Sequence, residues 1–189
     1  NFIFKQEAEK ANYFLTRFSS LIRKSLEFSK KSWISLEDEL EYLRQYLEME
    51  DMRFPEKFAY TFDIQPNLDL GFLQIPTLLL QPIVENSVKH GFKNLGYKGR
   101  LVIDLREVDS GVLQITIEDN GIGISKDILE WESRHSDPGE QPHGLQIIRD
   151  RLHLLQQEMP EYVFSFEITE TKHYSTGTKA ILRLPINLK

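Results

Sequence analysis

The sequence of 189 residues contains no cysteine, so neither disulfide bonds nor thiolate metal sites are available to it. It also lacks any run of about 18 or more apolar residues, the minimum for a membrane-spanning helix, and it shows no secretory signal peptide. Acidic residues outnumber basic ones, and the formal net charge is −6. This balance argues against a nucleic-acid binder, because binding to the phosphate backbone requires a basic face.

The residues that are present are ordinary for a globular protein. Hydrophobic residues make up 40% of the chain and charged residues 28%, which is enough to build a core. The length suits one domain with an appendage, or two small domains. The chain begins with Asn1 rather than methionine, and its first four residues resemble the middle of a structural element. We therefore expect a fragment of a longer protein, with any membrane part upstream.

Two amphipathic helices are expected first. The first runs from about Phe4 to Ser29, where apolar residues recur at helical spacing. In the second, Ser35 can cap the first turn together with Asp38, and Pro55 ends the helix. The apolar stripes consist of Ala8, Ala11, Phe14, Leu15, Phe18, Leu21, Ile22 and Leu26 in the first helix, and Leu36, Leu40, Leu43 and Leu47 in the second. The hairpin of helices has free faces, which pack either on the rest of the chain or on a second copy.

The pattern after Pro55 mixes strands with helices. A helix is expected from Pro76 to about His90, with a kink or a restart at Pro82, and another follows Gly144. Alternating apolar residues predict strands over residues 58–64, 101–105, 113–117, 162–169 and 178–185. The order predicts an α+β fold, with one sheet and helices on one face.

The stretch Ile117-Glu118-Asp119-Asn120-Gly121-Ile122-Gly123-Ile124 has two interpretations. Asn-Gly after an alternating run is typical of a hairpin, but the alternation fails soon after it. Alternatively, the stretch is a loop at the end of a buried strand, where Asp119 accepts a hydrogen bond from an exocyclic amine. Gly121 and Gly123 then let the backbone turn sharply and approach a ligand closely.

Three further motifs are weak when each is taken alone. In "VENSVKHG", Asn86 offers an oxygen suited to Mg²⁺ and Lys89 a charge for phosphate; otherwise the motif is a solvated helix face with Gly91 as its C-cap. Gly144 opens a helix whose free N–H groups can bind phosphate, although Gly-Leu before a helix is common. Gly177-Thr178 starts the last strand, and a plain turn explains it equally well.

Taken together and in this order, the four motifs resemble the N, G1, G2 and G3 boxes of the GHKL ATPase superfamily, which includes gyrase, sensor histidine kinases and the mismatch-repair ATPases. The stretches "ISLEDELEYLRQYLEMEDMRF" and "IPTLLLQPIVENSVKHGF" are similar to bacterial sensor histidine kinases that commonly partner LytTR-type response regulators. The resemblance covers nearly the whole chain. It implies a helical hairpin over residues 1–55, as the remnant of a dimerisation and phosphoacceptor region. A two-layer α/β sandwich, the Bergerat or GHKL ATP-binding fold, is implied over residues 56–189.

The resemblance also implies a role for each motif residue. Asp119 would accept the adenine amino group, with His90 beside the base and Thr178 supporting it through water. Asn86 would hold Mg²⁺ against the phosphates of ATP. Glu85 stands where related ATPases carry an acid that activates the attacking group. As a candidate catalytic residue, it comes second to Asn86. Lys89 would bind phosphate, and Gly121 and Gly123 would shape the pocket. Gly144 and Leu145 would close the phosphate side.

The resemblance implies that the intact protein transfers the γ-phosphoryl group of ATP to a histidine, and then to an aspartate of a response regulator. It also implies a homodimeric protein whose cytoplasmic region includes this chain and whose upstream segments lie in the inner membrane. The family modifies a histidine in an Asn-Pro-His-Phe context. None of the five histidines here has that context, so the acceptor is expected upstream of Asn1 and the fragment is not expected to autophosphorylate.

A second departure concerns the phosphate-side box. The family usually has Gly-x-Gly-Leu, whereas this chain has Pro142-His143-Gly144-Leu145. Proline removes a backbone N–H and fixes φ, in a stretch, residues 125–142, that matches the mobile lid of the family by position. Two rival functions therefore stay open. One is an ATPase that hydrolyses ATP to drive a conformational cycle, and the other is a non-catalytic interaction module with a degenerate lid.

Overall fold

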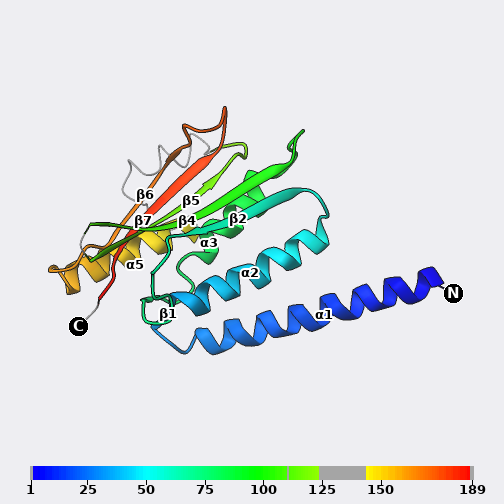
Figure 1. Ribbon diagram of the computed structural model, residues 1–189, viewed down its shortest axis with the longest axis horizontal. Coiled ribbons are helices and arrows are strands. Elements are labelled where there is room, and N and C mark those ends of the chain that lie inside the picture. The colour runs from blue at the N-terminus through cyan, green and yellow to red at the C-terminus, as the bar shows by residue number, and fades with distance from the viewer. Residues whose placement is uncertain (1, 110, 124–143, 188–189) are drawn as a thin grey trace, which may run out of the picture. The chain divides into compact units, whose positions relative to one another are not determined.

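The computed structural model describes residues 2–109, 111–123 and 144–187 (Figure 1). The chain divides into two compact units. The first comprises Asn1–Glu56 and Asp69–Leu80, and the second comprises Lys57–Leu68 and Gln81–Lys189. None of the helices among the described residues combines the length and the apolar character needed to cross a membrane.

The first unit is built on a helical hairpin, as predicted. Helix α1 (Phe2–Phe28) and helix α2 (Leu36–Arg53) run side by side in opposite directions (Figure 1). The Ser35 hydroxyl accepts a hydrogen bond from the Asp38 N–H at 3.1 Å, which confirms the predicted cap. An ion pair of 2.8 Å between Lys24 Nζ and Glu41 Oε2 links the two helices.

The apolar stripes of the two helices differ in burial. Leu36, Leu40, Leu43 and Leu47 of α2 are fully buried. On α1, Leu21 is buried, but Leu15, Phe18, Ile22 and Leu26 remain 57%, 41%, 45% and 61% exposed. The spacing of these four residues places them along one side of α1. This side of the helix therefore has no covering partner among the described residues.

A short ribbon completes the first unit, and it corrects one expectation. Strand β1 (Trp33–Ser35) pairs antiparallel with β3 (Gln74–Pro76). The expected helix therefore starts not at Pro76 but at Gln81, where α3 (Gln81–Asn86) begins. Of the kink or restart expected at Pro82, the restart is confirmed, because α3 begins at Gln81 and Pro82 lies in its first turn, where a missing N–H breaks no helical hydrogen bond.

The second unit contains a sheet of five strands in the order β2-β4-β5-β7-β6. Their bounds are β2 (Phe58–Ile64), β4 (Gly99–Asp109), β5 (Val112–Asp119), β6 (Ser165–Glu170) and β7 (Thr178–Pro185). Strands β2 and β4 are parallel, and the other neighbours are antiparallel. All five predicted strands are present, because each carries the period-two alternation of a sheet with one buried face.

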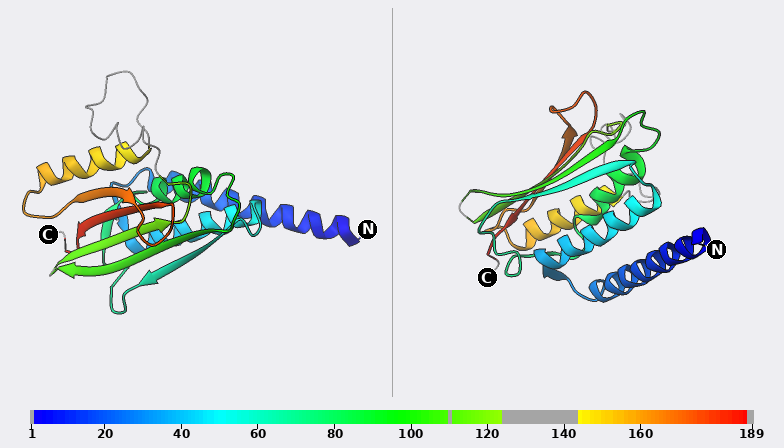
Figure 2. Two further views of the ribbon diagram at one scale, coloured as in Figure 1. Left: turned by 90° about the horizontal axis from the view of Figure 1, so that it is seen from above. Right: turned by 45° about the vertical axis from the view of Figure 1, so that its right-hand side comes forward.

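Helices cover one face of this sheet. Helix α3, the π-helical turn η1 (Ser87–Gly91) and α5 (Gly144–Glu158) all lie on the same side of the sheet (Figure 2). The core side chains of the central strands point towards them, and Leu101, Ile103, Leu105, Ile115 and Leu182 are 0% exposed. Ile148 and Leu152 supply the buried face of α5. The predicted α+β sandwich is confirmed.

Candidate functional site

The candidate site centres on Asp119, the last residue of β5, whose side chain faces the helical layer and is 3% exposed. Its Oδ2 accepts a hydrogen bond from the Ser87 hydroxyl at 2.6 Å. Its Oδ1 accepts the N–H groups of Gly121 at 2.8 Å and Thr178 at 3.2 Å. One carboxylate thus joins the π-helical turn, the loop after β5 and the start of β7.

The electrostatics of Asp119 reflect its burial. Burial raises the pKa of its carboxyl group, while the hydrogen bonds from Ser87, Gly121 and Thr178 act in the opposite direction. A carboxylate offers about four acceptor positions, and protein donors occupy three of them here, two on Oδ1 and one on Oδ2. No donor among the described residues fills the remaining position, on Oδ2, which suits a ligand that donates a single N–H.

Two glycines allow the backbone segments around Asp119 to approach one another. A Cβ atom on Gly121 would lie 2.5 Å from the carbonyl oxygen of Gly91, and one on Gly177 would lie 2.0 Å from the carbonyl oxygen of Asp119. Gly177 also has a φ of 142°. Side chains larger than hydrogen therefore cannot be placed at either position without moving the backbone.

The same geometry decides between the two interpretations of the Asp119–Gly123 stretch. Strand β5 pairs with β4 on one edge and with β7 on the other. Neither edge is free for a strand that follows Gly121, so the hairpin interpretation was wrong. The stretch is a loop, and the Ile122 N–H anchors it to the Gly91 carbonyl oxygen at 3.0 Å.

The residues of the "VENSVKHG" motif lie on α3 and on the π-helical turn. Asn86 ends α3, is half-buried and makes no hydrogen bond with its side chain to the described residues. Glu85 accepts hydrogen bonds from Gln81 Nε2 at 2.6 Å and from Lys89 Nζ at 2.7 Å. His90 is exposed. Isolated π-turns within helices often mark functional sites, and this one places Ser87 against Asp119.

The remaining predicted site residues lie at the start of α5, in the loop after β5 and outside the described residues. Gly144 opens α5, as predicted, and a Cβ there would lie 3.4 Å from the Cβ of Pro82, so the start of α5 lies against the start of α3. Leu145 is half-buried in the first turn of α5. Gly123 has a φ of 84°, which suits glycine. Pro142 and the rest of the expected lid, residues 125–142, lie outside the described residues.

Sequence reasoning did not predict three sets of contacts that build the site. Ser87 lies inside the quoted motif, but its partner Asp119 is 32 positions away in the sequence. The Gly177 backbone lies against Asp119, as its close approach shows. The Tyr97 hydroxyl donates to the Asn120 carbonyl oxygen at 2.8 Å and lies 3.3 Å from the Thr176 hydroxyl, so it ties two loops together. No local pattern marks such long-range contacts.

The described residues contain no group of three or more His, Asp or Glu side chains placed to hold a metal ion by themselves. Mg²⁺ does not require such a group, because it is usually held by one or two protein oxygens, by waters and by substrate phosphates. The side-chain oxygen of Asn86 fits that description, since no described residue occupies it.

Two family models match this chain. Residues 1–58 match the histidine kinase family model, and residues 75–188 match the model of histidine kinase-, DNA gyrase B-, and HSP90-like ATPases. The chain is 35% identical over 136 residues to the sensor protein LytS of Staphylococcus saprophyticus, covering 70% of this chain and 22% of that protein. It is 26% identical to the LytS protein of Streptococcus agalactiae, covering 97% of this chain and 30% of that protein. The chain thus spans less than a third of these relatives.

Solved structures support the fold. The histidine kinase domain of a blue-light activated kinase from Erythrobacter litoralis matches with a TM-score of 0.56 and 17% identity, over 97% of this chain and 82% of that one. Histidine kinase ThkA, in complex with the response regulator TrrA, matches with a TM-score of 0.55 and 16% identity, over 92% of this chain and 48% of that one. The chain belongs to the family of histidine kinase-, DNA gyrase B-, and HSP90-like ATPases.

Proposed function

We propose that this chain is the ATP-binding catalytic region of a two-component sensor histidine kinase. The single observation that carries the proposal is the Asp119 carboxylate, which is buried at a strand end and has one acceptor position that no described residue fills. Residues 56–189 would form the nucleotide-binding domain, and residues 1–55 would belong to the dimerisation and phosphoacceptor region. The family match over residues 75–188 and the LytS relatives support this assignment.

Adenine recognition is proposed to centre on Asp119. The exocyclic amine of adenine would donate to the free position on Oδ2, while Gly121 and Thr178 hold Oδ1 in place. His90 is exposed on the π-helical turn that also carries Ser87, so it is available to flank the base. Thr178 would support the base through water, in addition to its backbone hydrogen bond. Gly121 and Gly123 would keep the loop close enough to shape this pocket.

Phosphate binding is proposed for the helix termini and for Lys89. The ammonium group of Lys89 pairs with Glu85, and its side chain is 49% exposed, so it can turn towards a phosphate group. Gly144 and Leu145 would close the phosphate side at the start of α5, where free N–H groups favour an anion. Asn86 would hold Mg²⁺, which neutralises charge on the phosphates when it is bound.

Phosphoryl transfer would then depend mainly on positioning and charge. Glu85 Oε1 accepts from Gln81 and Oε2 accepts from Lys89, so a move of Lys89 to phosphate would take a positive charge away from Glu85 and leave Oε2 for the proton of an attacking group. This exchange would couple ATP binding to the release of Glu85. The acceptor is proposed to be a histidine on the N-terminal side of Asn1.

Further proposals concern the whole protein. It would act as a homodimer and pass the phosphoryl group to an aspartate of a LytTR-type response regulator. The exposed apolar side of α1, formed by Leu15, Phe18, Ile22 and Leu26, supports dimerisation because such a stripe fits a second helix. A location at the inner membrane, with this region in the cytoplasm, is proposed from the relatives called sensor proteins.

Calorimetric titration with ATP and ADP, with and without Mg²⁺, tests the proposal. Saturable binding that Mg²⁺ strengthens is expected. No binding at millimolar nucleotide would favour the alternative, a non-catalytic interaction module with a degenerate lid. A longer form of the protein that includes the upstream helix should become labelled by γ-labelled ATP and pass the label to a response regulator. Release of phosphate without any labelled protein would instead indicate an ATPase that drives a conformational cycle.

A further inference from the structure

Glu118 is a buried acidic residue on the face of the sheet opposite the helices. Because side chains alternate along β5, Glu118 points away from the face that holds Asp119. Other charged residues of that outward face are more exposed, as in the pair formed by Arg183 and Glu167, whose side chains are 32% and 54% exposed. The side chain of Glu118 is only 11% exposed. Burial of a carboxylate is costly unless hydrogen bonds compensate it, so its partners define its role.

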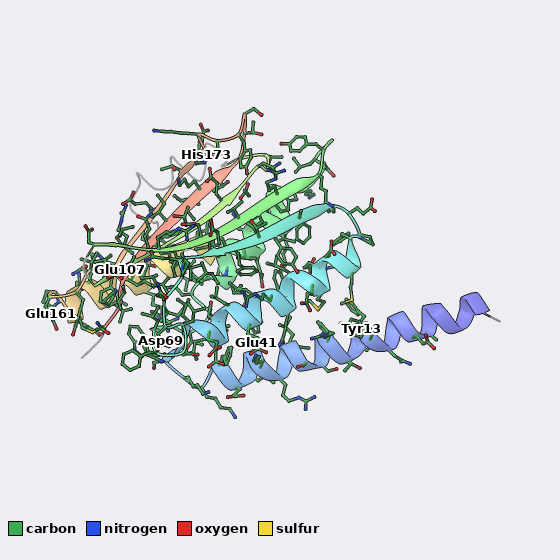
Figure 3. The ribbon with its side chains drawn as sticks, in the orientation of Figure 1. Tyr13, Glu41, Asp69, Glu107, Glu161 and His173 are labelled. Atoms are coloured by element: carbon green, nitrogen blue, oxygen red, sulfur yellow. The ribbon has the colours of Figure 1, made fainter. Side chains whose placement is uncertain are left out.

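The partners of Glu118 come from the loop between β6 and β7. The Thr171 hydroxyl hydrogen-bonds to Glu118 Oε1. The ring nitrogen Nδ1 of His173 lies 2.8 Å from Oε1 and 3.0 Å from Oε2. The Thr171 hydroxyl also accepts the His173 N–H at 3.1 Å, which closes a small network. His173 lies in that loop at one end of the sheet (Figure 3).

The same loop supplies backbone to the Asp119 site. At its base, the Thr171 N–H donates to the Gly177 carbonyl oxygen at 3.2 Å. The next residue, Thr178, donates its N–H to Asp119 Oδ1. Two consecutive residues of β5 therefore hold the two ends of one loop. Glu118 holds the end at Thr171 from the outer face, and Asp119 holds the end at Thr178 from the inner face.

We propose that Glu118 is a positioning residue for the nucleotide site, acting through Thr171 and Gly177 on the Thr178 N–H that orients Asp119. This inference rests on the proposed function for its effect on nucleotides, but its structural part does not. Without the Glu118 contacts, residues 172–176 gain conformational freedom, and the hydrogen bond from Thr178 to Asp119 is formed for a smaller fraction of the time. The open acceptor position on Asp119 Oδ2 is then less well placed for the adenine amine.

Two substitutions test the contacts, and a third controls for charge. Glu118→Gln keeps the shape and one acceptor oxygen, and Thr171→Val removes the hydroxyl while keeping a β-branched side chain in a strand-end position. Glu167→Gln makes the same charge change on the same face of the sheet, in strand β6, where Glu167 pairs with Arg183 of β7. Each is made in the full chain, and each variant is first shown to be folded by thermal unfolding.

The first measurement needs no nucleotide. Amide hydrogen exchange, resolved by residue, should speed up at Gly177 and Thr178 in Glu118→Gln and Thr171→Val, by about tenfold for the loss of one hydrogen bond. Exchange at Leu182, in the centre of β7, should stay unchanged, because that amide reports opening of the sheet as a whole. Unchanged exchange at Thr178 in both variants would overturn the positioning role, as would an equal increase at Leu182.

The second measurement compares ATP with inosine triphosphate, which lacks the exocyclic amine. Glu118→Gln should lower the affinity for ATP roughly fivefold to tenfold more than that for inosine triphosphate, whereas Glu167→Gln should leave the ratio unchanged. Equal losses for both nucleotides would overturn an effect through Asp119. If the unmodified chain binds neither nucleotide, the proposed function fails, and the exchange at Thr178 still decides the positioning role on its own.

Discussion

Replacing Asp119 by asparagine removes the acceptor position on Oδ2 that is available to a ligand, and it keeps the hydrogen bonds within the protein. An asparagine with its oxygen at the Oδ1 position still accepts from Gly121 and Thr178. Its NH₂ group then takes the Oδ2 position, where the Ser87 hydroxyl can turn and accept from it. All protein partners stay satisfied, so the domain should remain folded. The ligand, in contrast, loses its acceptor, because an N–H group now faces the adenine amine.

The expected loss of affinity follows from that single contact. A hydrogen bond to a charged group contributes about 1.5–3 kcal/mol, so Asp119→Asn should weaken ATP binding roughly 10- to 100-fold. Calorimetry measures the affinity, and urea unfolding of the same sample measures stability. Unchanged ATP affinity in a folded variant would refute the assignment of Asp119, and a variant that fails to fold would refute the hydrogen-bond exchange with Ser87.

The pKa of Asp119 gives this substitution a second readout. Burial raises the pKa of the folded carboxyl group above its ordinary value of 3.8, so the folded protein holds the proton at a higher pH than the unfolded chain does. The protonated carboxyl therefore contributes stability that is fully present below the unfolded pKa and is lost as pH rises through the folded pKa. Asp119→Asn should remove this contribution to the pH dependence of the free energy of unfolding. An identical pH profile in both proteins would contradict the raised pKa.

Three other changes have defined outcomes. Gly177→Ala places a Cβ 2.0 Å from the Asp119 carbonyl oxygen. Because of the resulting backbone strain and overpacking, it should lower the free energy of unfolding in urea by roughly several kcal/mol. A change below about 0.5 kcal/mol, the size typical of surface substitutions, would contradict the close approach. Asn86→Ala should abolish the strengthening of ATP binding by Mg²⁺ while leaving the affinity without Mg²⁺ unchanged, by calorimetry; a retained Mg²⁺ effect would exclude Asn86 as the ligand. Phe18→Ser, at a side chain 41% exposed on α1, should weaken self-association of the longer protein in sedimentation velocity with little change in Tm; unaltered association would remove this side of α1 from the dimer.

The elements that the sequence predicted well are those with a strong local period. The stripe of α2 and the alternation in β4 and β5 each repeat over several residues, and each element is present. Ser35 could be identified as a cap because its partner Asp38 is only three residues away. The glycines after Asp119 could be placed in a loop because the alternation stops there. In each case the determining contact is local.

The start of α3 shows why prediction failed where distant residues decide. The stretch from Pro76 to Leu80 suits a helix by composition, but Thr77 donates its N–H to the Ser32 carbonyl oxygen, and the β1–β3 ribbon ends there. The carboxylate of Glu39, which is 0% exposed, accepts the N–H groups of Leu78 and Leu80, both at 2.9 Å. Two charge-assisted hydrogen bonds outweigh the helix propensity of the three leucines, because propensities differ by less than about 1 kcal/mol per residue. They also hold Leu78 at a φ of 53°.

The two carboxylates that close β5 show how one strand end can serve two faces of a sheet. The alternation that buries Asp119 under the helices necessarily sends Glu118 to the other side. Each then needs compensation for its burial, and the loop between β6 and β7 provides part of it to both, through Thr178 on one face and through Thr171 and His173 on the other. Because the loop is held from both faces, loosening one carboxylate should disturb the other, although the two side chains lie on opposite sides of the sheet. The fine geometry of the site thus depends on a contact that the helical face alone does not reveal.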